Sequence, residues 1–151
     1  MATFDSIDAL TAAVGQTLGT TEWQVVSQER IRAFADVTGD HQWIHVDEER
    51  AQVESPFGTT VAHGALTLAL VPVFVGELVR VPGASMVVNG GLERVRFRAP
   101  VPAGAKVRGM VKLLSTVELA DATQVVARAT VQVYGEQKPA CVADQVMVLH
   151  D

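Results

Sequence analysis

The feature that most constrains the fold is a stretch without charged residues in the middle of the chain. No Asp, Glu, Lys or Arg occurs between Glu54 and Glu77. A run of this length could cross a bilayer as a helix, but residues 55–60 read SPFGTT, which is typical of a turn. The apolar part that remains, residues 65–75, has the length of a buried core helix. Because a helix that is apolar on all sides must be covered, we expect no membrane span and a sheet around this helix.

The second half of the chain provides the strands of such a sheet. We expect the apolar helix to extend over residues 64–80, after which valine-rich segments with alternating polar and apolar residues begin. These segments predict strands over residues 85–98, 106–119, 123–134 and 140–149. Glycine, proline and aspartate mark the turns between them. Helices followed by consecutive strands indicate an α+β fold with an antiparallel sheet.

The first half of the chain is predicted to contain short helices and one further strand. Residues 6–14 favour a helix and residues 20–26 a strand, which brings the sheet to about five strands. Ser27 suits a helix N-cap and Gly39 a helix end, so we expect a helix between them. Another short helix is expected over residues 48–53.

Length and charge narrow the class of protein. The 151 residues suit one domain, and no repeat or linker divides them, so we expect residues 1–151 to form a single domain. Acidic residues outnumber basic ones by 17 to 12, which argues against binding to nucleic acid because phosphates require a basic surface. A lone cysteine, Cys141, and a start without a basic secretory signal favour a cytoplasmic protein.

The loop expected after Gly39 carries residue types that suit acid–base catalysis. Asp40, Gln42 and His45 lie within six residues of one another, and loops on a rigid scaffold often carry catalytic groups. A carboxylate and an imidazole five residues apart can converge on one water molecule if the loop doubles back. Gln42 offers an amide to hold that water. An ordinary turn with a packed histidine would show the same spacing, so the residues alone leave both interpretations open.

A second candidate site lies where the apolar helix begins. A helix N-terminus presents unpaired N–H groups and a partial positive charge, which can bind an anion or stabilise a developing oxyanion. Gly64 lets a ligand approach its N–H closely, although a glycine here could equally serve close packing of helix and sheet. His63 precedes it and could transfer a proton or only form a local hydrogen bond.

Three segments, taken together, resemble the MaoC-like dehydratase family, which includes the (R)-specific enoyl-CoA hydratases. The family pattern runs from an aromatic residue through Gly-Asp-x-Asn-Pro, an aliphatic residue and His to a later Ala or Ser. It is matched by Phe34, Gly39, Asp40, Ile44, His45 and Ala51. The helix-start element matches at residues 61–66, and a strand ending in Pro-Val-Pro-x-Gly matches at residues 88–104. Gln42-Trp43 replaces the family's Asn-Pro, which changes the reach of the carboxamide.

The resemblance implies a single hot dog fold, in which an antiparallel sheet wraps around a long central apolar helix. It also implies a homodimer and the reversible syn hydration of a trans-2-enoyl-CoA to an (R)-3-hydroxyacyl-CoA, with no cofactor and no metal. Asp40 and His45 would hold and deprotonate the water, and the Gly64 N–H would bind the thioester carbonyl. Candidate contacts to the water or the substrate are Gln42, His63 and Asn89. Metal- and phosphate-binding motifs such as HExxH and GxxxxGK are missing from the sequence.

Three arginines occupy every second position at the end of one predicted strand. In a regular strand, Arg94, Arg96 and Arg98 would lie on one face. There they could bind the phosphates of coenzyme A or simply form a solvated face of the sheet.

The sequence leaves other functions open. The acyl carrier could be an acyl carrier protein (ACP) instead of coenzyme A, which would make the protein a (3R)-hydroxyacyl-ACP dehydratase subunit of fatty-acid metabolism. A hot dog thioesterase fits the Gly-Asp-x-x-x-x-His spacing less well. The replacement of Asn-Pro by Gln42-Trp43 would also suit a non-catalytic subunit that binds acyl thioesters.

Overall fold

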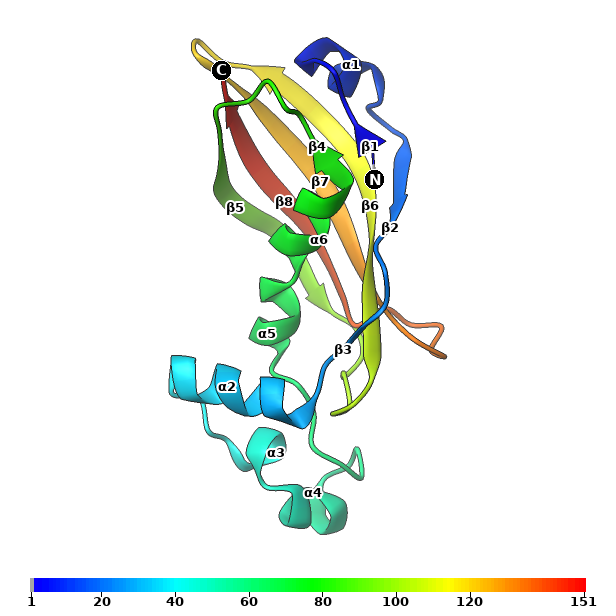
Figure 1. The fold of residues 1–151 in the computed structure, drawn as a ribbon. Helices are drawn as coiled ribbons and strands as arrows, with labels where there is room; N and C mark the ends of the chain where they lie inside the picture. The colour runs from blue at the N-terminus through cyan, green and yellow to red at the C-terminus, as the bar shows by residue number, and fades with distance from the viewer. Residues whose placement is uncertain (1) are drawn as a thin grey trace.

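An antiparallel sheet packed against two consecutive helices forms the body of the protein (Figure 1). The computed structural model describes residues 2–151. Its helices are α1 (Ile7–Ala12), α2 (Gln28–Thr38), α3 (Trp43–Val46), α4 (Glu48–Glu54), α5 (Gly64–Ala69) and α6 (Val71–Leu78). Its strands are β1 (Ala2–Thr3), β2 (Thr17–Thr20), β3 (Gln24–Val25), β4 (Val79–Arg80), β5 (Met86–Phe97), β6 (Lys106–Glu118), β7 (Ala122–Val133) and β8 (Cys141–His150).

The main sheet has the strand order β2-β6-β7-β8-β5, and β3 also pairs with β6. Its pairings are antiparallel, and the four long strands start and end within one residue of the predicted bounds. The predicted α+β fold with an antiparallel sheet is therefore confirmed. The strand expected over residues 20–26 is instead divided between β2 and β3. Between them the Thr21 hydroxyl, and not a backbone carbonyl, accepts the hydrogen bond of the Gly109 N–H (3.0 Å), which interrupts the ladder.

Alternating small and branched side chains bury one face of the sheet against α5 and α6. In β7 every second residue from Val125 to Val133 is buried, as period-two alternation requires. The buried helix residues are Leu66, Thr67, Val71, Phe74, Val75 and Leu78. α6 can approach β6 closely because Gly109 has no side chain: a Cβ atom there would lie 2.5 Å from the Cβ atom of Phe74.

The central apolar helix is not continuous. Where one helix was expected over residues 64–80, α5 and α6 meet at Leu70. Pro72 lies in the first turn of α6, and it lacks an N–H and its ring clashes with the preceding turn, which explains the break. The helix also ends earlier than expected, because β4 pairs with β1 in a separate parallel pair. Among residues 2–151, no helix is long and apolar enough to cross a membrane.

Candidate active site

The turn that follows α2 presents Asp40. Gly39 ends α2 in the left-handed conformation (φ 82°), which a glycine adopts without strain. The Asp40 N–H then donates to Thr38 Oγ1 (3.3 Å), and the Gln42 N–H donates to Asp40 Oδ1 (3.4 Å). These local bonds shape the turn and leave Asp40 and Gln42 exposed.

His45, in α3, is buried and its ring is fixed by a backbone group. The residue is 6% exposed, and its Nδ1 lies 2.7 Å from the carbonyl oxygen of Val61. A carbonyl oxygen can only accept a hydrogen bond, so Nδ1 carries the proton of the neutral ring. The other ring nitrogen, Nε2, is then an acceptor that can take a proton from a water molecule.

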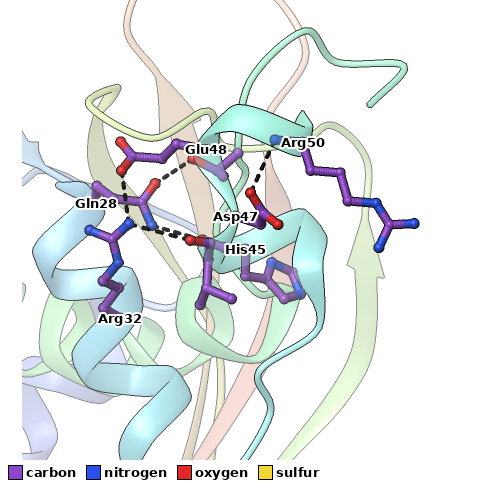
Figure 2. A network of polar contacts seen from close by, with 8 residues as sticks. Gln28, Arg32, His45, Asp47, Glu48 and Arg50 are labelled. Carbon is purple, nitrogen blue, oxygen red and sulfur yellow. Dashed lines mark hydrogen bonds and ion pairs between the residues drawn. The ribbon is translucent and has the colours of Figure 1, made fainter. Parts of the chain in front are cut away.

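A glutamine from α2 holds the backbone of His45 in place (Figure 2). The Gln28 amide N–H donates to the His45 carbonyl (2.8 Å), and the Thr60 hydroxyl donates to the amide oxygen of Gln28. Arg32, one turn further along α2, donates to the Val46 carbonyl (3.3 Å) and pairs with Glu48 (2.8 Å). α2 is thereby joined both to α3 and to the segment that leads into α5.

His63 lies next to both members of the predicted catalytic pair. It is 2% exposed, and its Nε2–H donates to the carbonyl oxygen of Asp40 (2.9 Å). Its ring stacks on the ring of His45, with centroids 3.8 Å apart and planes 23° apart. The ring of Phe34 packs against the His63 ring, with centroids 4.9 Å apart. The second ring nitrogen of His63, Nδ1, is buried without a hydrogen-bond partner in the described part of the chain.

Asp40, His45 and His63 therefore form one cluster. One ligand atom of each residue lies within 4.8 Å of the other two. The two histidine rings are stacked in nearly parallel planes. Nδ1 of His45 and Nε2 of His63 bond to backbone carbonyls, which leaves His45 Nε2 and His63 Nδ1 as the ring nitrogens without a protein partner among the described residues.

The N-terminus of α5 lies beside a pocket of about 340 Å³. Gly64 is the first residue of α5, so its N–H has no partner within the helix. Gly64, Thr67, Phe97 and Arg98 are among the residues that line the pocket. A Cβ atom at position 64 would lie 3.2 Å from the Phe97 ring, so both packing and access to the N–H explain a glycine here.

The structure separates the other candidate residues from this cluster. Asn89 lines a different pocket, of about 510 Å³, beside α6, where its Oδ1 accepts from the Gln145 amide (2.6 Å). Asn89, predicted as a contact to the water or the substrate, thus lines another pocket than Gly64 does, and its role stays a prediction. β5 has an irregular register between Glu93 and Arg96, and Arg94 there has a φ of 51°. The regular alternation that would place the three arginines on one face does not hold in this segment.

Sequence patterns did not reveal Gln28 or Thr60. The hydrogen bond from Gln28 to His45 spans 17 residues of sequence, and the bond from Thr60 to Gln28 spans 32. Neither residue belongs to a local motif. An indirect signal was the position of Gln28, which lies three and seven residues before Ile31 and Ala35, the buried residues of α2, and so on the same side of that helix.

Comparisons with known proteins agree with this geometry. The MaoC like domain family matches residues 9–135. The 3-hydroxyacyl-thioester dehydratase Z of Mycobacterium tuberculosis (strain ATCC 25618 / H37Rv) is 47% identical over 148 residues, which cover 97% of each chain. The (R)-specific enoyl-CoA hydratase of Rhodospirillum rubrum is 33% identical over 94 residues, which cover 62% of each chain. The R-hydratase PhaJ1 from Pseudomonas aeruginosa has a similar fold, with a TM-score of 0.71 at 22% identity over 91% of this chain and 82% of that one.

The fold is the hot dog fold, and the family match and the named relatives define a hydro-lyase of the kind that hydrates or dehydrates acyl thioesters. The chain belongs to the MaoC-like dehydratase family.

Proposed function

We propose that this protein is an (R)-specific enoyl-CoA hydratase, which adds water reversibly and syn to a trans-2-enoyl-CoA to give an (R)-3-hydroxyacyl-CoA. The observation that carries the proposal is the cluster of Asp40, His45 and His63 within 4.8 Å, in which His63 directly precedes Gly64, the first residue of α5. The names of the two relatives describe dehydration and hydration of acyl thioesters, which are the two directions of one reaction.

Asp40 and His45 handle the protons in this mechanism. His45 Nε2 and the Asp40 carboxylate hold a water molecule, and one of the two removes a proton from it. The water oxygen forms a bond to C3 of the thioester, and the electrons of the C2–C3 double bond move toward the carbonyl to give an enolate. One of the pair then returns a proton to C2 on the same face, which completes a syn addition of one water. Gln42, exposed beside Asp40, is a further candidate contact to that water.

The Gly64 N–H stabilises the charge that develops on the thioester oxygen. A donor aimed at this oxygen contributes most in the enolate, where the negative charge is largest, and so it lowers the barrier. Arg98 lines the pocket next to Gly64 and is our first candidate for contact with the phosphates of coenzyme A. Arg94 and Arg96 are weaker candidates, because β5 is irregular around them.

We also propose that residues 1–151 act as one MaoC-like domain and pair as a homodimer in the cytoplasm. β5 lies at one end of the strand order and has β8 as its neighbour. Within residues 2–151 no strand lies along its other edge, which is available to pair with a second copy. The fully buried thiol of Cys141 is consistent with a reducing compartment.

Purified protein should be tested with crotonyl-CoA and with a longer trans-2-enoyl-CoA, by following the loss of absorbance of the conjugated thioester. The product should serve as substrate for an (R)-specific dehydrogenase. Asp40→Asn and His45→Gln should each lower kcat at least about a hundredfold, since each removes a group that exchanges protons with water or substrate. Asp36→Asn is the matched control: Asp36 is exposed and pairs with His41 (2.9 Å) outside the cluster.

Different results would point to the other functions. Faster turnover of an ACP thioester would identify an ACP dehydratase, and release of free thiol would identify a thioesterase. Saturable binding of acyl-CoA without turnover would identify a non-catalytic subunit. Activity of Asp40→Asn close to that of Asp36→Asn would refute the assignment of Asp40.

A further inference from the structure

His63 contacts the backbone of one proposed catalytic residue and the ring of the other. Its Nε2–H bond to the Asp40 carbonyl, at 2.9 Å, is shorter than the 3.3 Å and 3.4 Å bonds that Asp40 makes within its own turn. It also spans 23 residues, whereas those two bonds span two each. The exposed turn that carries Asp40 is therefore tied to the start of α5 through the His63 ring.

The stacked ring fixes the second residue. The His45 ring is held at one edge by the Val61 carbonyl, and a bond at one edge leaves rotation about that bond free. The face-to-face contact with His63, 3.8 Å between centroids, restricts this rotation. Phe34, 4.9 Å from the His63 ring, supports the stack. Together the two contacts set both the direction of His45 Nε2 and its distance from Asp40.

The hydrogen bonds also define the chemical state of the stack. His63 donates through Nε2, so its Nδ1 is the unprotonated nitrogen of the neutral ring, and that atom is buried without a partner.

We infer that His63 is a positioning residue, which holds the Asp40 backbone and the His45 ring so that both address one water molecule, and which transfers no proton itself. This inference rests on the proposed function. It differs from a role in substrate binding, because the contacts of His63 run to protein groups and its ring is 2% exposed.

Two substitutions separate the two contacts. In His63→Gln the amide nitrogen is as many bonds from the backbone as Nε2, so the donor to Asp40 is kept and the ring is lost. In His63→Phe the ring is kept and the donor is lost. We expect each to lower kcat about tenfold and His63→Ala to lower it about a hundredfold, with KM changed less than about threefold, since a small misplacement of reacting groups costs this much. His41→Gln, at an exposed histidine outside the cluster, should leave kcat unchanged.

A double-mutant cycle tests whether His63 acts through the pair. In a His45→Gln background, His63→Gln, which removes only the stacked ring, should lower the residual kcat less than about twofold, because the His45 ring that it would misalign is already absent. A full tenfold effect in that background would overturn the inference. So would a rise of KM with kcat unchanged, which would indicate a substrate contact, or His63→Ala with wild-type kcat.

The arrangement can also be tested without any substrate. A two-bond ¹H–¹⁵N correlation spectrum, recorded at a pH where the histidine rings are neutral, should show the Nε2–H tautomer for His63 and the Nδ1–H tautomer for His45. The opposite tautomer of His63 would overturn the inference even if the enzyme is active. Absence of turnover with every thioester would refute the proposed function, while the spectrum would still decide on the arrangement of the two rings.

Discussion

The two residues of the proposed catalytic pair are positioned through the segment that leads into α5. His45 Nδ1–H bonds to the Val61 carbonyl (2.7 Å), and the Asp40 carbonyl accepts from His63 (2.9 Å). Gly64, whose N–H we assign to the thioester carbonyl, follows directly in the chain. The acid–base pair and the oxyanion donor are thus tied to the same four residues of backbone, so a shift of one would shift the others with it.

Cys141 provides a test of burial at the residue scale. Its side chain is fully buried, and burial raises the pKa of the thiol to about 11. Because the thiolate is the reactive form, we expect the native protein not to react with 5,5′-dithiobis(2-nitrobenzoate) at pH 8. Unfolding in guanidinium should release one reactive thiol per chain, and Cys141→Ser should give none in either state. Rapid labelling of the native protein at pH 8 would contradict the burial of the Cys141 thiol in β8.

Local spacing predicted part of the candidate site but not its supports. Asp40 and His45 were singled out because a carboxylate and an imidazole follow a helix end in a recognisable motif, and the structure does place them together. Gln28 could not be found in this way, because its partners are 17 and 32 residues distant. The expectation that Arg94, Arg96 and Arg98 share one face did not hold, because β5 has an irregular register between Glu93 and Arg96, and regular alternation is the assumption on which such predictions depend.

At the scale of elements, the packing of α6 on the sheet depends on a glycine in β6. A Cβ atom at Gly109 would lie 2.5 Å from Phe74 Cβ, closer than atoms can approach, and Phe74 is fully buried. Gly109→Ala should therefore lower the free energy of unfolding by about 1–3 kcal/mol, the usual cost of overpacking a core. Urea unfolding followed by circular dichroism would measure this change.

Gly76 offers the matched control for this substitution. It lies in the same helix as Phe74, with open space where a Cβ atom would be. Gly76→Ala should leave the stability unchanged or raise it by up to about 1 kcal/mol, because alanine is the better helix former. Equal stability of the Gly109→Ala variant and the wild type would show that α6 can move away from β6 without cost.

The long elements were predictable, and the breaks between them were not. The four long strands were predicted to within one residue, because valines alternate with polar residues where β6 and β7 each bury one face. The division of the apolar helix at Leu70 was missed, although Pro72 was visible in the sequence, because proline is also common in the first turn of a helix. The split between β2 and β3 depends on a side-chain bond from Thr21 to a strand 88 residues away.

At the scale of the whole molecule, the two edges of the sheet differ. One edge is formed by the short strands β2 and β3, and the other by β5, which has 12 residues. Long unpaired edges are normally covered or charged in stable proteins. β5 carries charged residues at positions 93, 94 and 96, but it also exposes apolar side chains at Met86, Val87, Val88 and Phe97, which is what we expect of a strand that pairs with a second copy.

The homodimer can be tested by placing a charge on this strand. Val87 is 57% exposed, and Val117 in β6, which β7 and β8 separate from β5, is 48% exposed. We expect a wild-type mass of about twice the chain mass of 16.1 kDa in multi-angle light scattering. Val87→Lys should shift the protein to the mass of one chain at micromolar concentration, since burying a lysine at an interface is costly, whereas Val117→Lys should stay dimeric. A monomeric wild type, or dissociation by Val117→Lys but not by Val87→Lys, would show that β5 is not the interface.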